Sequence, residues 1–144
     1  MQIERRKFLE STCKACLLAG AGIFISNLTA CSPSAQVTKL PITDNTVRFP
    51  VTGFAANSLQ IIRPEGWYYD IALRKTDAGE YEALLLECTH QQNQLISVPN
   101  GFKCTQHGSQ FNLDGQVVKG PAERPLKNYK TSIDQGQLVI QLKS

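Results

Sequence analysis

Two short stretches decide the fold of this chain: Cys88-Thr89-His90 and, thirteen intervening residues later, Cys104-Thr105-Gln106-His107. The chain contains only two histidines, and each follows a cysteine by two or three positions. If the protein is exported, a disulfide is the default expectation for two thiols, but a disulfide would not explain the two histidines. We therefore predict a metal site formed by Cys88, His90, Cys104 and His107.

The ligand types leave two candidate centres open. Two thiolates and two imidazoles suit one tetrahedral zinc ion, or a [2Fe-2S] cluster whose two irons divide the ligands. Zinc fingers usually pair cysteine with cysteine and histidine with histidine, whereas each stretch here contains one of both. A structural zinc-binding module remains the alternative to an iron-sulfur centre.

The chain around these stretches is predicted to be all-β. Short apolar runs alternate with turn sequences such as Asp114-Gly115 and Pro99-Asn100-Gly101, and there is no sustained helical period after Asn45. Pro50 marks an edge position, because proline cannot donate to a sheet ladder. This pattern favours an antiparallel sandwich or small barrel. Strands are expected at residues 46–51, 59–62, 67–73, 81–87, 94–98, 116–119, 129–133 and 137–142.

The two stretches resemble the Rieske [2Fe-2S] motif, Cys-x-His and Cys-x-x-His on two loops, and the resemblance extends over about 45–142. It implies a Rieske-like fold with a two-loop cluster-binding subdomain. By this resemblance Cys88 and Cys104 hold one iron, while His90 and His107 hold the other. Neutral imidazoles in place of two thiolates make the cluster less negative and raise its potential.

Two further elements of the resemblance surround the ligands. Ser109 stands where a hydroxyl donates a hydrogen bond to a bridging sulfide, so it is included among the cofactor-binding residues. Gly120-Pro121-Ala122 is similar to the proline loop that covers the cluster in this family. The alternative for these three residues is an ordinary Gly-Pro turn.

The sequence also departs from the high-potential members of the family. Those members carry one extra cysteine in each loop, and the two form a disulfide; the matching positions here are Asn93 and Gln106. A tyrosine of that group is replaced by Phe111. Because hydrogen bonds to the cluster stabilise its reduced state, we expect a potential within roughly −150 to +300 mV and below the top of that range.

The first thirty residues are predicted to be a signal peptide, with a charged start and an apolar stretch at about residues 15–25. The run beginning Arg5-Arg6 and ending at Leu9 resembles a twin-arginine export signal, with an ordinary Sec signal as the alternative. Leu28-Thr29-Ala30-Cys31 resembles a lipobox, which implies lipidation of Cys31.

These features predict a lipid-anchored linker over residues 31–44 and a folded domain over residues 45–144. We expect an exported protein, tethered to the cell membrane or outer membrane and facing the periplasm or the cell exterior.

Length and charge narrow the function. The 144 residues suffice for one compact domain. The net charge of +3 falls to +1 without residues 1–30, which contain four basic and two acidic side chains, so no nucleic-acid partner is expected.

A Rieske cluster has no open coordination position, so we expect an electron-transfer protein or oxidoreductase subunit rather than a stand-alone enzyme. The expected partners are redox proteins and, through the lipid, a membrane; no small-molecule substrate is predicted. By the resemblance, His90 and His107 expose their outer nitrogens and form the electron exit. The alternative is a Rieske subunit of a quinol-oxidising or other oxidoreductase complex, anchored by an uncleaved signal.

Overall fold

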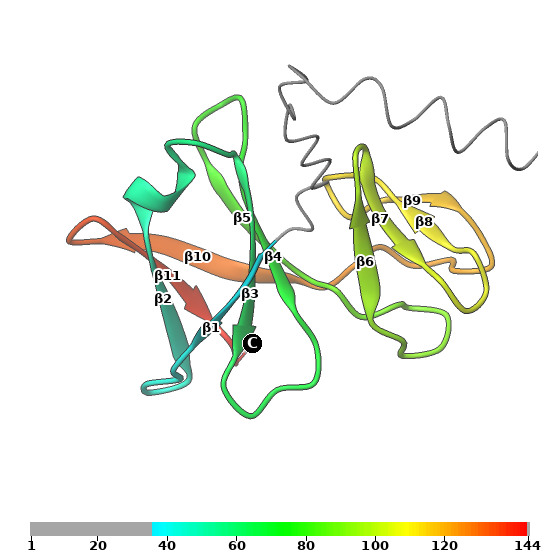
Figure 1. Cartoon of the computed structure of the whole chain (residues 1–144), viewed down its shortest axis with the longest axis horizontal. Helices are drawn as coiled ribbons and strands as arrows, with labels where there is room; N and C mark the ends of the chain where they lie inside the picture. The colour runs from blue at the N-terminus through cyan, green and yellow to red at the C-terminus, as the bar shows by residue number, and fades with distance from the viewer. Residues whose placement is uncertain (1–35, 144) are drawn as a thin grey trace, which may run out of the picture. The chain divides into compact units, whose positions relative to one another are not determined.

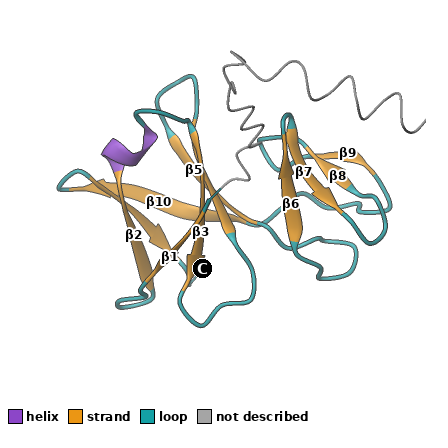
Figure 2. Cartoon of the chain, in the orientation of Figure 1, coloured by secondary structure: helices purple, strands orange, loops and turns teal. Residues whose placement is uncertain are grey.

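The structure is a computed structural model that describes residues 36–143, and it confirms the all-β prediction (Figure 1). Within that range the only helical element is the 3-10 segment η1 (Val51–Phe54), as Figure 2 shows. The strands are β1 (Val37–Leu40), β2 (Thr46–Pro50), β3 (Leu59–Pro64), β4 (Ile71–Lys75), β5 (Tyr81–Leu85), β6 (Leu95–Val98), β7 (Gly101–Cys104), β8 (Gln110–Phe111), β9 (Val117–Lys119), β10 (Asn128–Asp134) and β11 (Gln137–Gln141).

Seven strands form one sheet in the order β1-β3-β4-β5-β10-β11-β2. The sheet curls until its two edge strands, β1 and β2, approach each other, which gives a nearly closed small barrel. Pro50 ends the edge strand β2, as expected for a residue without an N–H donor. All pairs in this sheet are antiparallel except β1 with β3, which is parallel.

The central strands β4 and β5 are apolar on both faces because a separate core lies on each side. Ile71 and Leu73 of β4 belong to the core enclosed by the curled sheet. Ala72, which points the opposite way, belongs to a second core between this sheet and the rest of the domain. Buried apolar residues on both faces explain the continuous hydrophobic runs in these strands.

The second core is completed by the four-stranded sheet β6-β7-β8-β9. This antiparallel sheet is inserted between β5 and β10 in the sequence. One connecting loop leads from β5 into β6, and another joins β7 to β8. The first loop contains Cys88 and His90, whereas Cys104 is the last residue of β7 and His107 follows it in the second loop.

Four details of the sequence prediction are wrong. Val37–Leu40 lies in the segment expected to be a linker, but it adds a strand to the sheet edge, so the folded domain begins before residue 45. Residues 67–70 are not part of β4, because Gly66, with a φ of 79°, turns the chain after β3. The sequence prediction also lacked β7 and β8, which have four and two residues and contain too few apolar positions to show a period.

Gly101, at the start of β7, is a strict requirement of the fold. Its φ is 146°, and a Cβ atom there would overlap the backbone carbonyl oxygen of Phe111 and lie 2.9 Å from the Cα of Asn112. The close approach of β7 to the chain after β8 therefore has no room for a side chain.

We predict that Gly101→Ala lowers the free energy of unfolding by at least about 3 kcal/mol and reduces metal content, because β7 must shift. The matched control is Gly79→Ala, at a turn with a φ of 83° and no atom within 4 Å of the added Cβ. That control should cost about 1 kcal/mol of backbone strain. Chemical denaturation and iron analysis measure both effects, and equal losses in the two variants would contradict the prediction.

Candidate metal centre

The two predicted loops are built alike. The backbone N–H of Cys88 donates to the carbonyl of Asn93 at 2.8 Å, and the N–H of Cys104 donates to the carbonyl of Ser109 at 2.8 Å. Each cysteine thus bonds to the residue five positions later and closes a short loop around its histidine. The similarity of the two stretches in sequence corresponds to a similarity in local structure.

The two thiols lie inside the second core and close to each other. Cys88 and Cys104 are both fully buried, and neither forms a disulfide. Burial raises the pKa of Cys104, but the backbone N–H groups of His107 and Gln106 and the thiol of Cys88 outweigh it, so the pKa is lowered. The site therefore favours a thiolate, the form that binds metals.

The two histidines lie at the surface beside these buried thiols. The imidazole rings of His90 and His107 are exposed, with 5.0 Å between their centroids and an interplanar angle of 87°. Residues from two separate loops thus meet in one place. All four predicted ligands are brought together, with sulfur atoms inside and imidazoles outside.

Ser109 connects the second loop to the Gly120-Pro121-Ala122 segment. Its side chain is fully buried, and its Oγ accepts a hydrogen bond from the backbone N–H of Ala122 at 3.1 Å. A hydroxyl that accepts this bond keeps its own proton for donation. Ser109 therefore satisfies a backbone group of the segment while remaining able to donate toward a bound group.

Sequence reasoning missed several contacts that hold the first loop. Tyr69 Oη donates to the carbonyl of Gln92 at 2.6 Å, and the backbone N–H of Asp70 donates to the side chain of Gln94 at 3.1 Å. Residues 67–70 had the composition of a strand, and no sequence signal indicated that they contact this loop.

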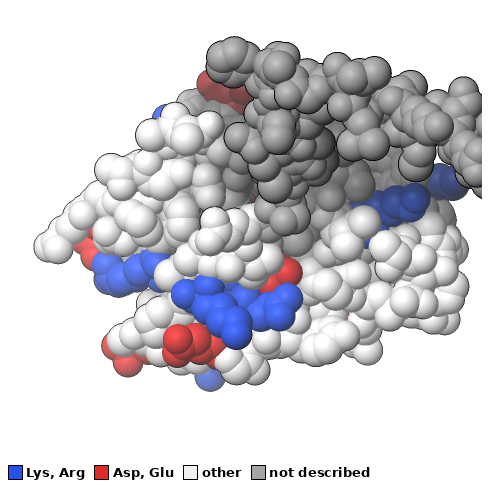
Figure 3. Space-filling view, viewed as in Figure 1, with Lys and Arg blue, Asp and Glu red and all other residues white. Residues whose placement is uncertain are grey.

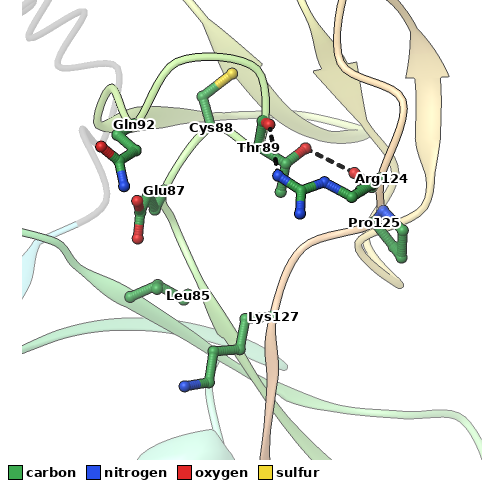
Figure 4. Close-up of a pocket in the computed structure, with 8 residues that line it drawn as sticks. All are labelled: Leu85, Glu87, Cys88, Thr89, Gln92, Arg124, Pro125 and Lys127. Carbon is green, nitrogen blue, oxygen red and sulfur yellow. Dashed lines mark hydrogen bonds between the residues drawn. The ribbon is translucent and has the colours of Figure 1, made fainter.

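A pocket of about 450 Å³ lies along the first loop (Figure 4). Thr89 and Arg124 form one wall: Thr89 Oγ1 donates to the carbonyl of Arg124 at 2.7 Å, and Arg124 Nη2 donates to the carbonyl of Thr89 at 3.5 Å. These bonds connect the first loop to the chain that follows the Gly-Pro-Ala segment. The lining residues are Leu85, Glu87, Cys88, Thr89, Gln92, Arg124, Pro125 and Lys127.

The donor set fits a redox metal centre. Adjacent thiolates suit iron-sulfur chemistry, and imidazole suits iron as well as zinc. Among residues 36–143, no three His, Cys, Asp or Glu side chains are placed to hold one metal ion together. The fold and the site together define a small all-β protein in which two similar loops bring two thiols and two imidazoles together.

Comparison with known proteins identifies this class more closely. Residues 51–130 match the Rieske [2Fe-2S] domain, and the chain belongs to that family. Its cofactor is a [2Fe-2S] cluster, which decides between the two centres that the ligand types left open.

Individual relatives agree with this assignment. The chain is 49% identical over 41 residues to the chloroplastic cytochrome b6-f complex iron-sulfur subunit of Bigelowiella natans, covering 28% of this chain and 16% of that protein. It is 31% identical over 64 residues to the corresponding subunit of Chlorobaculum thiosulfatiphilum, covering 43% of this chain and 35% of that protein. The matches thus span about a third or less of these relatives.

A solved structure supports the fold. The crystal structure of the cyanobacterial plasma membrane Rieske protein PetC3 from Synechocystis PCC 6803 superposes with a TM-score of 0.53 and 23% identity, covering 63% of this chain and 93% of that one. The Rieske-like fold expected from the sequence is therefore confirmed. The ligand roles of Cys88, His90, Cys104 and His107, and the role of Ser109, stay predictions that the geometry supports. Cys31 lies outside the described residues.

We predict that Ser109→Ala lowers the reduction potential by roughly 40 mV. This corresponds to a hydrogen bond that is about 1 kcal/mol stronger in the reduced state. The substitution also leaves the buried N–H of Ala122 without its partner, which should cost about 1–3 kcal/mol of stability. Redox titration and denaturation test both effects, with Ser132→Ala, an exposed position on β10, as the control. An unchanged potential would show that the hydroxyl does not donate to the cluster.

Proposed function

We propose that this protein is a one-electron carrier that is exported and tethered to a membrane by a lipid on Cys31. Electron transfer of the Rieske type follows from the family. The observation that carries the proposal is the placement of buried thiols beside two exposed histidines at one surface.

When bound, the cluster accepts and releases one electron. The protein residues keep the sulfur ligands away from water and bring the imidazole edges to the surface, where a partner can approach. Because both rings are exposed, a partner can contact them without opening the fold. This arrangement suits transfer between proteins and needs no substrate pocket.

The two loops that contain these histidines are polar and uncharged, although the charged side chain of Arg124 lies beside Thr89 of the first loop. No Asp, Glu, Lys or Arg occurs from Cys88 to Phe102 or from Cys104 to Leu113. On the face drawn in Figure 3, basic side chains form clusters with acidic side chains close to them. The loops themselves therefore offer a partner shape and hydrogen bonds, and any charge beside them comes from neighbouring residues such as Arg124.

The proposal of export and tethering is supported by the sequence of residues 1–31, which lies outside the described part of the chain. The twin-arginine-like run supports export after cluster assembly, because that route carries folded proteins, and the lipobox-like Leu28 to Cys31 supports an anchor. Within residues 36–143 we find no helix of the length and apolarity that a membrane crossing requires. In this proposal residues 32–36 act as a short tether before β1.

A second candidate is a subunit of a larger oxidoreductase complex. The relatives named above are subunits of cytochrome b6-f complexes, and this supports redox proteins as partners. In this alternative the N-terminal segment remains uncleaved and is the anchor. The two candidates therefore differ in the mature N-terminus and share the same site.

We predict that the purified protein is coloured and gives an EPR signal when reduced. Its reduction potential should lie below roughly +300 mV, the upper limit of the family range.

Phe111→Tyr should raise the reduction potential, because it introduces a hydroxyl at a position that is buried in the second core. Redox titration of both proteins measures this. A wild-type value at the upper limit would refute the argument from Phe111 and from the absent disulfide.

Cys31→Ala should move the protein from the membrane fraction to the soluble fraction, because it removes the lipidated thiol. Cell fractionation measures the shift, and mass spectrometry should find wild-type protein beginning at a lipid-modified Cys31. An intact N-terminus that includes Met1 would instead favour the uncleaved anchor. Ser34→Ala, three residues beyond the cysteine, serves as the control and should remain in the membrane fraction.

A further inference from the structure

We propose that residues 67–70, here named the support segment, position the first cluster loop through Tyr69 and Asp70. In this role they connect the first loop to the chain that leads into β4. The inference rests on the proposed assignment of Cys88 and His90 as ligands. Its experiment therefore distinguishes failure of the support from failure of that assignment.

The first loop needs a support of its own. Asn93 and Gln106 leave no cysteine pair to join the two loops. The second loop is fixed by the hydrogen bond between Ser109 and Ala122. The Thr89–Arg124 bonds hold only the beginning of the first loop. Its later part is tied to its beginning by the backbone bonds from Cys88 to Asn93 and from Leu95 to Leu86, and it also contacts the support segment.

Tyr69 holds this later part at a strained residue. Gln92 has a φ of 31°, a conformation that residues other than glycine rarely adopt. The Tyr69 hydroxyl donates to the Gln92 carbonyl at 2.6 Å and so stabilises that conformation. Burial, and then the negative charge of Glu87, raise the pKa of Tyr69. Its hydroxyl therefore keeps the proton that it donates.

Asp70 holds the end of the loop through Gln94. The Asp70 backbone N–H donates to Gln94 Oε1 at 3.1 Å, and Gln94 Nε2 donates to Asp70 Oδ2 at 3.2 Å, so both ends of the amide are bound. Asp70 is itself buried and fixed by Arg63, whose Nε and Nη2 donate to its two carboxylate oxygens at 2.6 and 3.1 Å. This bidentate pair makes the carboxylate a rigid anchor.

The two contacts act on the geometry of the metal site. Gln92 and Gln94 flank Asn93, whose carbonyl accepts the N–H of Cys88. Fixing the residues on both sides of Asn93 therefore fixes the bond that orients Cys88, and with it the short loop that contains His90. Tyr69 and Asp70 are positioning residues, because their hydrogen bonds to the loop go to Gln92 and Gln94, which are not predicted ligands.

The test compares the rate of cluster loss in two tyrosine variants. Tyr69→Phe removes only the hydroxyl that binds Gln92, whereas Tyr68→Phe removes the hydroxyl of its neighbour, which is 74% exposed. Bleaching of the visible absorption in excess iron chelator gives the rate. We expect Tyr69→Phe to lose the cluster about fivefold faster, as loss of one hydrogen bond implies, and Tyr68→Phe to match the wild type.

A third variant separates positioning from general stability. Thr131 Oγ1 donates to the carbonyl of Tyr81 at 2.8 Å, a bond of the same kind in the seven-stranded sheet. Thr131→Val should lower the unfolding midpoint as much as Tyr69→Phe without accelerating cluster loss. Gln94→Leu, which breaks the second contact, should accelerate cluster loss and also alter the EPR spectrum.

The outcomes are distinct. Wild-type rates of loss in both Tyr69→Phe and Gln94→Leu would overturn the inference and leave the ligand assignment intact. Equal acceleration by Thr131→Val would also overturn it, because the effect would then reflect general stability. A wild-type protein without iron and acid-labile sulfide would refute the ligand assignment itself.

Discussion

In each of two loops, the backbone N–H of a cysteine donates a hydrogen bond to the carbonyl of the residue five positions later. The other strands and loops hold this arrangement in place. The bond forces the chain to turn within a few residues, so that a thiol faces the core while a histidine reaches the surface. One such loop could bind only half of a cluster. The fold therefore has to place two of them edge to edge, with the sulfur atoms of Cys88 and Cys104 adjacent.

That placement is achieved by sharing β4 and β5 between two cores. The curled seven-stranded sheet encloses one core and, through residues such as Ala72 and Leu84 on its other face, builds the second core that contains both cysteines. The metal site thus rests on the most deeply packed strands of the protein. Close packing of this kind leaves the two cysteines little freedom to move, and the proposed role as a one-electron carrier requires a rigid site.

The cysteine-histidine stretches could be recognised in the sequence, whereas the contacts that hold them could not. Both cysteine-histidine stretches and most long strands could be identified, because ligand spacing and apolar alternation are local signals. β1 was missed because its four residues are exposed or partly exposed, and the strand depends on backbone pairing with β3. Tyr69 was assigned to a strand, since nothing in its neighbours shows that its hydroxyl reaches Gln92, 23 residues further along the chain. Contacts of this kind depend on tertiary structure, and a single sequence carries no local signal for them.

The proposed assignment of His90 and His107 as cluster ligands is tested most directly by pulsed EPR of the reduced protein. The protein is labelled with ¹⁵N-histidine and purified without a histidine tag. Because the chain contains only His90 and His107, every strongly coupled histidine nitrogen belongs to one of these two residues. We predict two such nitrogens bound to one iron of the cluster, and the loss of one when either histidine is replaced. A cluster signal without histidine nitrogen coupling, or a colourless protein that contains zinc and gives no signal, would contradict it.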